Sequence, residues 1–265
     1  DMLLQAENIS GGYGRRIICH DICFSVRDGE MLCVAGPNGS GKSTLFRLLL
    51  RFNPLSGGRV TLDGEDMAQM TPSQLAAALA YIPQTHNPVF AYSVLELVLM
   101  GRAGHFSAFS VPKAVDEERA MDCLERLRIA QFAQRNYMEL SGGQRQLVLI
   151  ARALAQEAQV LIMDEPASAL DYANSQLILE AVNDLRMQGY AVIMSTHSMD
   201  TPLACADRML LLKEGRVHFY GTPLETLTPD NLEAVYGLPM DVLPVVDRNG
   251  CIRHVCLPVQ REGLA

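Results

Sequence analysis

The stretch Gly36-Pro37-Asn38-Gly39-Ser40-Gly41-Lys42-Ser43 decides the fold of this chain. It follows the apolar run 31–35 and precedes the run 44–50, which has the spacing of a helix. Glycines let the backbone curl so that successive N–H groups point into one concavity, and the positive end of the following helix adds to the field there. The stretch therefore predicts a phosphate-binding loop between a buried strand and a helix.

Each part of this loop has an expected role. Lys42 should reach the β- and γ-phosphates of a nucleotide, and Ser43 should ligate Mg²⁺. A glycine turn that merely begins a helix and carries a surface lysine is the alternative, and the strand and helix on either side disfavour it. The residues expected to bind ATP here are Gly36, Pro37, Asn38, Gly39, Ser40, Gly41, Lys42, Ser43 and Thr44.

The rest of the chain predicts an α/β fold. Short apolar runs without helical period are typical of strands buried on both faces. They alternate with helical stretches such as 176–187, so a mostly parallel sheet is expected. The apolar runs are residues 31–35, 160–163, 191–194 and 209–212.

Three segments depart from this alternation inside a single domain, 1–265. Residues 2–30 and 58–64 have the glycine turns of an antiparallel β-subdomain. Residues 89–158 contain no convincing strand, which predicts an inserted α-helical subdomain. Residues 222–265 begin with the helix-start signal Thr222-Pro223-Leu224-Glu225 and contain Asn249-Gly250, so a C-terminal helix and β-hairpin extension is expected.

Composition limits the possible partners. The 265 residues are 49% hydrophobic and carry a formal net charge of −8, with a pI near 5.3. An acidic protein is repelled by nucleic acid and by anionic lipid, so neither is expected as the main partner. The seven cysteines lack paired CxxC spacing, and we expect reduced, mostly buried thiols in a cytosolic protein. No apolar run approaches the roughly 18 residues that suggest a transmembrane helix, so a membrane role would require a partner.

A second motif, Leu140-Ser141-Gly142-Gly143-Gln144, separates this chain from kinases, GTPases and motors that share the phosphate loop. A serine and two glycines before the helix 144–156 make an anion site from free N–H groups, a hydroxyl and the helix dipole. The motif resembles the signature sequence of the ABC ATPase family. That resemblance implies docking on the γ-phosphate held by the other subunit, hence a head-to-tail homodimer with two composite sites.

A buried strand ending in two acids supplies further chemistry. It places Asp164 and Glu165 at the carboxyl edge of the sheet, where Asp164 should hold Mg²⁺ and Glu165 should orient or deprotonate the attacking water. The stretch Ser168-Ala169-Leu170-Asp171 is similar to the family's D-loop, which crosses the dimer interface. Read alone, it would only be a helix N-cap.

The resemblance assigns three more residues. It implies that His197, after the predicted strand at 191–196, is a switch histidine that contacts the γ-phosphate. It implies that Gln84 is the Q-loop glutamine, which approaches Mg²⁺ and the water and links the core to the helical insertion. It also implies that Tyr13 stacks on adenine. Ala167 stands where the family usually has a threonine or serine, which leaves the catalytic groups intact.

Within the family, residues 93–102 are similar to the importers of iron-siderophore, haem, cobalamin or molybdate. The resemblance then implies an ATP-driven importer subunit on the cytoplasmic face of the plasma membrane, with two permease subunits and, indirectly, a periplasmic or extracellular solute-binding protein. Residues 85–109, with Val89, Phe90, Tyr92, Phe106 and Phe109, would form the permease docking groove, and packing under the helical subdomain is the other reading of these side chains.

Two alternatives belong to other classes. A soluble ABC ATPase of the iron-sulfur assembly type remains open, whereas the tandem cassettes, coiled coils or basic arms of repair and translation members are not seen. A small-molecule P-loop kinase is disfavoured by the signature at 140–144.

Overall fold

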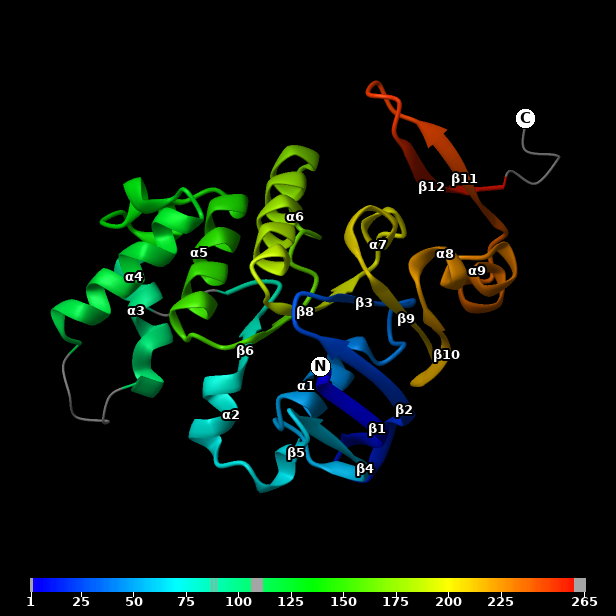
Figure 1. Ribbon diagram of the computed structural model, residues 1–265, viewed down its shortest axis with the longest axis horizontal. Coiled ribbons are helices and arrows are strands. Elements are labelled where there is room, and N and C mark those ends of the chain that lie inside the picture. Colours follow the sequence, from blue (N-terminus) through cyan, green and yellow to red (C-terminus); the bar gives the residue numbers. More distant parts are fainter. Residues whose placement is uncertain (1, 87, 89, 106–111, 260–265) are drawn as a thin grey trace. The chain divides into compact units, whose positions relative to one another are not determined.

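The computed structural model describes residues 2–86, 88, 90–105 and 112–259. The chain forms two compact units, and each is described by itself. Unit 1 comprises Asp1–Ala68 and Ile193–Ala265, and unit 2 comprises Gln69–Val192. Strand β8 (Ala191–Thr196) and the short 3-10 helix η1 (Met67–Gln69) run across the division. Figure 1 labels β8 and most of the other strands and α-helices along the chain.

Unit 1 holds most of the strands. Its elements are β1 (Met2–Tyr13), β2 (Arg16–Arg27), β3 (Met31–Ala35), α1 (Lys42–Leu49), β4 (Leu55–Leu62), β5 (Glu65–Asp66), α7 (Asp200–Cys205), β9 (Arg208–Lys213), β10 (Arg216–Gly221), α8 (Pro223–Thr226), α9 (Pro229–Tyr236), β11 (Met240–Val246) and β12 (Ile252–Pro258).

Unit 2 holds most of the helices. Its elements are α2 (Pro72–Ala78), β6 (Leu79–Ile82), α3 (Val94–Leu99), η2 (Met100–His105), α4 (Ala114–Arg126), η3 (Ala130–Phe132), η4 (Tyr137–Glu139), α5 (Gly142–Ala155), β7 (Val160–Met163) and α6 (Tyr172–Met187).

The antiparallel part of unit 1 is a four-stranded sheet in the order β2-β1-β4-β5. Strand β1 pairs antiparallel with both β2 and β4, and its register shifts several times along each pairing. Such shifts bend and twist a strand. The predicted antiparallel β-subdomain is confirmed.

The parallel part of unit 1 carries the phosphate loop. Strand β3 is buried at every residue and pairs in parallel with β9, so that Ala35 lies opposite Leu211. Strand β10 continues from β9 as an antiparallel hairpin. A fully buried strand needs apolar side chains on both faces, which is why its sequence lacks alternation. The predicted α/β class is confirmed.

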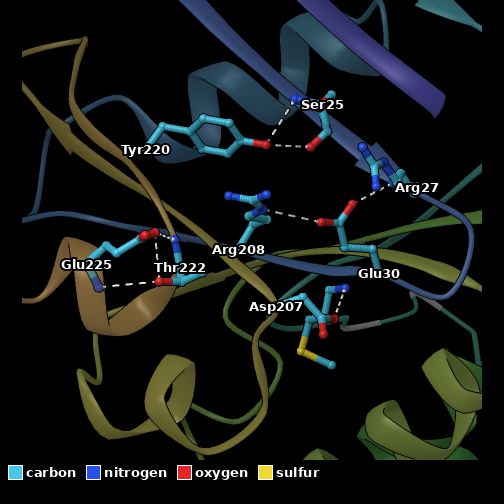
Figure 2. Close-up of polar contacts among 9 residues, drawn as sticks. Ser25, Arg27, Glu30, Asp207, Arg208, Tyr220, Thr222 and Glu225 are labelled. Atoms are coloured by element: carbon cyan, nitrogen blue, oxygen red, sulfur yellow. Dashed lines mark hydrogen bonds and ion pairs between the residues drawn. The ribbon is translucent and has the colours of Figure 1, made fainter.

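Polar contacts fix the ends of these strands (Figure 2). The Tyr220 hydroxyl on β10 donates to the carbonyl of Ser25 on β2 at 2.9 Å. The Asp207 carboxylate accepts the Met31 backbone N–H at 2.8 Å, and the Asp207 N–H donates to the Met31 carbonyl at 3.0 Å. The start of β3 is thereby held beside β9.

In unit 2, β6 and β7 pair in parallel with Ile82 opposite Met163. Within the segment 89–158, where helices were expected, α4 buries Ala120, Cys123 and Leu124. Its first turn is tied by an ion pair between Asp116 and Arg102, both nearly buried, at 3.3 Å. The proposal that 89–158 is a subdomain of its own stays a prediction.

The C-terminal segment packs on the strands of unit 1. Helix α8 starts with the capping box of Thr222 and Glu225, and the β11–β12 hairpin turns around Gly250. One buried hydrophobic cluster contains residues of α9, of the segment just before α9, and of strands β3 and β9. Its members are Ala35, Met209, Leu211, Leu227, Leu232 and Val235. Ala35, the residue that precedes the phosphate loop, is therefore packed against the α9 region.

The prediction of mostly buried cysteines is wrong. Cys23 and Cys251 are exposed, because one occupies an outward position of β2 and the other the turn of the β11–β12 hairpin. Of the seven, all free thiols, Cys19, Cys33 and Cys123 are buried and Cys205 and Cys256 are intermediate. Among the described residues, no helix is long and apolar enough to cross a membrane.

Candidate functional site

The backbone of the phosphate loop needs its glycines. Gly39 and Gly41 adopt positive φ angles of 80° and 105°. Gly36 has φ 153°, and a Cβ there would lie 2.3 Å from the Leu212 carbonyl oxygen and 2.7 Å from Ser40 Oγ. A side chain at Gly36 would displace β9, and one at Gly39 or Gly41 would be strained. The curled loop predicted at 36–43 is present.

The Lys42 side chain lies against this loop. Its ammonium donates to the carbonyls of Gly36 at 2.8 Å and Pro37 at 3.3 Å, and the residue is only 7% exposed. A cation held at the mouth of a curled backbone attracts anionic oxygens. This arrangement of donors and charge suits an anionic group such as phosphate.

Helix α1 follows the loop. Its N-cap residue is Gly41, which as a glycine makes no side-chain cap hydrogen bond. Ser43 in the first turn is exposed, and Thr44 is buried. An uncapped helix start with an exposed hydroxyl suits phosphate and a hard cation.

The turn between β9 and β10 contacts the phosphate loop through a backbone hydrogen bond. The Gly215 N–H donates to the Ser40 carbonyl at 2.9 Å. Cys19 lies beside the same region, with Sγ donating to the Gly41 carbonyl at 3.6 Å. Burial raises the pKa of the Cys19 thiol to about 12. This thiol stays protonated and serves packing.

Two further residues of unit 1 were assigned by resemblance. Tyr13 ends β1 and is 50% exposed, with the Arg47 guanidinium over its ring at 5.7 Å from the centroid. His197 is exposed and directly follows β8, where the Ser198 N–H donates to Thr196 Oγ1 at 3.1 Å. The Tyr13 side chain is half exposed, and His197 is exposed.

The acidic pair of unit 2 lies at the end of β7. The Asp164 N–H donates to the Ile82 carbonyl at 2.9 Å, which extends the β6–β7 pairing by one residue. Glu165 has a positive φ of 45°. A left-handed backbone conformation is strained in residues other than glycine, and residues with this conformation are often found at functional sites. The backbone thus turns sharply where a catalytic carboxylate is predicted.

Three predicted motifs of unit 2 meet at this turn. Gln84 Nε2 donates to Ser168 Oγ at 2.8 Å, and that hydroxyl donates to the Glu165 carbonyl at 3.0 Å. A cavity of about 120 Å³ is lined by residues of the Q-loop, the signature and the D-loop together, among them Gln84, Gly142 and Leu170. The structure therefore brings Gln84, Glu165 and the D-loop together.

The signature begins α5. Ser141 is its N-cap: Oγ accepts the Gln144 N–H at 3.3 Å, and Gln144 Oε1 accepts the Ser141 N–H at 3.0 Å. Leu140 before it is buried. A Cβ at Gly143 would lie 2.5 Å from Asn174 Oδ1, so glycine lets α5 approach α6. The helix predicted at 144–156 is present but begins two residues earlier, at Gly142, with Ser141 as its N-cap.

The D-loop ends in the N-cap of α6. Asp171 accepts the Asn174 N–H at 2.8 Å and its side-chain N–H at 2.9 Å. Ala169 is exposed and Leu170 lies beside Gly142. Asn174, which touches both motifs, was missed by the sequence reasoning. Its position three residues after a capping aspartate was the available signal.

The predicted permease groove is described only in part. Phe90 is 68% exposed and Met100 41% exposed, and Tyr92 lies edge-on to Phe90 with ring centroids 6.0 Å apart. Val89, Phe106 and Phe109 lie outside the described residues. Exposure of Phe90 and Met100 argues against packing as the role of these two side chains.

Comparison with known proteins gives the family. A family sequence profile described as "ABC transporter" matches residues 19–168, more than half of the chain. The molybdate import ATP-binding protein MolC of Haemophilus influenzae is 38% identical over 89% of this chain and 89% of its own length. The iron(3+)-hydroxamate import ATP-binding protein FhuC of Bacillus subtilis is 34% identical over 98% of this chain and 97% of its own.

Solved structures agree. An inward-facing putative metal-chelate type ABC transporter contains a chain with TM-score 0.88 and 34% identity, covering 98% of this chain and 99% of that one. An ATP-binding cassette of an ABC transporter in its ADP conformation gives TM-score 0.81 at 28% identity, over 89% and 98% of the two chains. Together with the phosphate loop, the acidic pair and the signature, these matches show that the chain belongs to the ABC transporter family and is one of its ATP-hydrolysing, ATP-binding subunits.

Proposed function

We propose that this chain powers the import of a metal chelate or an oxyanion through a separate membrane permease. The observation that carries the ATP-binding half of this proposal is the Lys42 ammonium, which is held against the Gly36 and Pro37 carbonyls of a curled, glycine-rich loop. The importer half rests on the relatives, whose names describe import of molybdate, of hemin and of iron(3+)-hydroxamate.

The nucleotide is held at two ends in unit 1. The loop N–H groups and Lys42 receive the phosphates, and the half-exposed ring of Tyr13 receives adenine. His197 contacts the γ-phosphate. The hydroxyl of Ser43 in unit 1, and the carboxylate of Asp164 and the amide oxygen of Gln84 in unit 2, are each of a kind that ligates Mg²⁺. The cation would neutralise charge that develops on the phosphates.

Hydrolysis depends on Glu165. Its carboxylate orients the attacking water and takes up its proton. The strained φ of 45° and the hydrogen bond from Ser168 to its carbonyl fix the backbone that carries this carboxylate. Because Gln84 donates to the same Ser168 hydroxyl, a shift of Gln84 alters the support of Glu165. This linkage gives γ-phosphate sensing a route to the catalytic turn.

The chain works as a head-to-tail homodimer on the cytoplasmic face of the membrane. Ser141 and the α5 N-terminus of one protomer dock on the γ-phosphate that the other protomer holds, and the D-loops 168–171 meet across the interface. A solute-binding protein on the far side delivers the solute to the permease.

The catalytic assignment is tested by Glu165→Gln. We expect turnover to fall about 10²-fold or more while ATP affinity stays within a few fold, because glutamine keeps the shape and hydrogen bonds of the side chain but is no base. Gel filtration with Mg-ATP should show this variant trapped as a dimer. The matched control is Glu180→Gln on the exposed face of α6. A monomeric Glu165→Gln protein with near wild-type hydrolysis would refute the role.

The coupling surface is tested by Phe90→Asp. The control is Met187→Asp, which changes an apolar residue that is 73% exposed at the end of α6 in the same unit. We expect Phe90→Asp to abolish stimulation of ATP turnover by the reconstituted permease and to leave basal turnover intact, whereas Met187→Asp leaves both intact. Unchanged stimulation in Phe90→Asp refutes docking there, and loss of basal turnover indicates packing instead.

A further inference from the structure

The ring of Tyr13 lies on a narrow turn. Tyr13 pairs with Arg16 at the end of the β1–β2 hairpin, and a Cβ on the preceding Gly12 would meet the Arg16 carbonyl at 2.1 Å. The ring is half exposed, so this turn alone leaves it loosely placed. A base-stacking ring that is already held in one orientation contributes more to binding, because ordering a mobile ring on binding costs entropy.

Arg47 provides a surface behind the ring. It lies in the last turn of α1, and its guanidinium carbon is 5.7 Å from the Tyr13 centroid and 5.8 Å from the Phe52 centroid. Both distances are within cation–π range. Phe52 is 58% exposed. We call these three side chains the Tyr13–Arg47–Phe52 row.

A buried asparagine fixes the arginine. Arg47 Nε donates to Asn53 Oδ1 at 3.1 Å, and Asn53 Nδ2 donates to the Gly12 carbonyl at 2.6 Å. Asn53 is 7% exposed, so both ends of its amide are satisfied inside the protein. The backbone N–H groups of Phe52 and Asn53 also donate to the Arg47 carbonyl, at 2.9 Å and 3.2 Å.

The same helix therefore reaches both ends of the nucleotide site. Lys42 begins α1 at the phosphate loop, and Arg47 is five residues later, about 7.5 Å along the helix axis. Through Asn53, this helix is also tied to Gly12, the residue next to Tyr13. The spacing between the phosphate contacts and the aromatic ring is thus set by one rigid element.

We propose that Arg47, held by Asn53, is a positioning residue for the purine base: it backs the ring of Tyr13, and with Phe52 it fixes the plane on which adenine stacks. The inference rests on the proposed stacking role of Tyr13. It goes beyond that role by assigning recognition of the base to α1 and to the loop that follows this helix.

The experiment compares the binding of ATP with the binding of tripolyphosphate, which has the phosphates but no base. Calorimetric binding of Mg-ATP and of inorganic tripolyphosphate is measured for wild type, Arg47→Met, Arg47→Lys and Tyr13→Ala. Methionine keeps the length of the side chain without charge or hydrogen bonds, and lysine keeps the charge without the planar fork that reaches Asn53. The control is Arg51→Met, which removes the neighbouring arginine that donates to the Met67 carbonyl.

Arg47→Met should weaken ATP binding roughly 3- to 10-fold and leave tripolyphosphate binding unchanged. Arg47→Lys should fall between wild type and Arg47→Met, and Arg51→Met should match wild type. The double variant Tyr13→Ala/Arg47→Met should bind ATP no more weakly than Tyr13→Ala. Both substitutions act on the same contact, the stacking of adenine on Tyr13, so their effects should not add. In steady-state kinetics, KM for ATP should rise in Arg47→Met while kcat is retained.

The outcomes separate the two proposals. If Tyr13→Ala leaves ATP affinity unchanged, the stacking role of Tyr13 is wrong and the inference falls with it. If Tyr13→Ala weakens ATP binding but Arg47→Met does not, only the inference about Arg47 is overturned. Equal weakening of ATP and tripolyphosphate in Arg47→Met would also overturn it, since Arg47 would then support the phosphate loop itself.

Discussion

Two helix starts in this molecule are built from serine and glycine, and they differ in one respect. The N-cap residue of helix α1 is Gly41, which has a φ of 105° and makes no side-chain cap hydrogen bond. The N-cap residue of helix α5 is Ser141, whose capping box with Gln144 already satisfies N–H groups at the start of that helix. The positive end of a helix attracts anions in both cases. An uncapped start is prepared for a ligand, whereas a capped start is stable without one.

The difference matches the proposed division of work between them. The α1 start must hold phosphate whenever nucleotide is bound, and Lys42 adds a charge to it. In the proposed dimer, the α5 start contacts phosphate only when the second protomer binds. Until then, its own capping box satisfies backbone N–H groups there. The predictions below change one start at a time.

The largest expected effect comes from breaking both starts in different chains. Lys42→Ala removes the cation of the first start, and Ser141→Arg blocks phosphate approach to the second. Each homodimer then has two damaged sites, and its turnover should drop by about 10²-fold or more. A heterodimer of the two variants keeps one site in which both parts are intact, so mixing the purified chains should restore part of the wild-type turnover.

The measurement is ATP turnover across a series of mixing ratios, with each variant alone as the control. Recovery should be greatest near equal amounts of the two chains. Wild-type-like turnover of either variant alone, or no recovery at any ratio by folded proteins, contradicts composite sites.

A smaller effect separates ligand binding from stability. Gly41→Ala puts a side chain at φ 105° with only ordinary contacts around its Cβ, so the cost is conformational, about 1–2 kcal/mol. We expect ADP binding to weaken roughly tenfold, because the loop must change shape. Ser141→Ala should leave ADP binding unchanged and lower the free energy of unfolding by about 1 kcal/mol, since a cap is lost.

ADP is the right probe because it lacks the γ-phosphate that the signature is proposed to receive. Calorimetry gives the ADP affinity and urea denaturation gives the free energy of unfolding of each variant. If Ser141→Ala weakens ADP binding as much as Gly41→Ala does, the two starts do not divide their work in this way.

The sequence predicted the elements that both starts need. Buried strands have an apolar run, and the runs 31–35 and 160–163 became β3 and β7 with unchanged limits. Helix α1 begins two residues earlier than the periodic run, at Lys42, because the loop glycines already curl into the first turn. Such features are local, so a short window of sequence contains them.

Contacts between distant residues were not predictable in the same way. Gln84 and Ser168 are 84 residues apart, and Asn53 reaches Gly12 across 41 residues. Nothing in either neighbourhood marks the partner, because the fold alone brings the side chains together. The prediction that the cysteines are mostly buried was wrong for a related reason. It used the average burial of cysteine and ignored that some positions of β2 face outward, as Cys23 does.

The smallest expected effect concerns Cys19, which lies close to the α1 start. A thiol near a helix N-terminus normally has its pKa lowered, because the N–H groups favour the thiolate. Cys19 instead donates to the Gly41 carbonyl, and burial raises the pKa of its thiol to about 12. At pH 8 the thiolate fraction is then about 10⁻⁴. Since thiolate is the reactive form, iodoacetamide at pH 8 should label Cys23 and Cys251, both exposed, and spare Cys19.

Peptide mass spectrometry after a timed reaction gives the labelling of each cysteine, and ADP affinity should stay at the wild-type value throughout. Denatured protein is the control, in which Cys19 should react as fast as the others. The expected dependence on pH follows from the raised pKa: Cys19 labelling stays low until the pH approaches 12 or the protein unfolds. Rapid labelling of native Cys19 at pH 8, with loss of ADP binding, would mean that the field of the uncapped α1 start reaches this thiol as well as the phosphate loop.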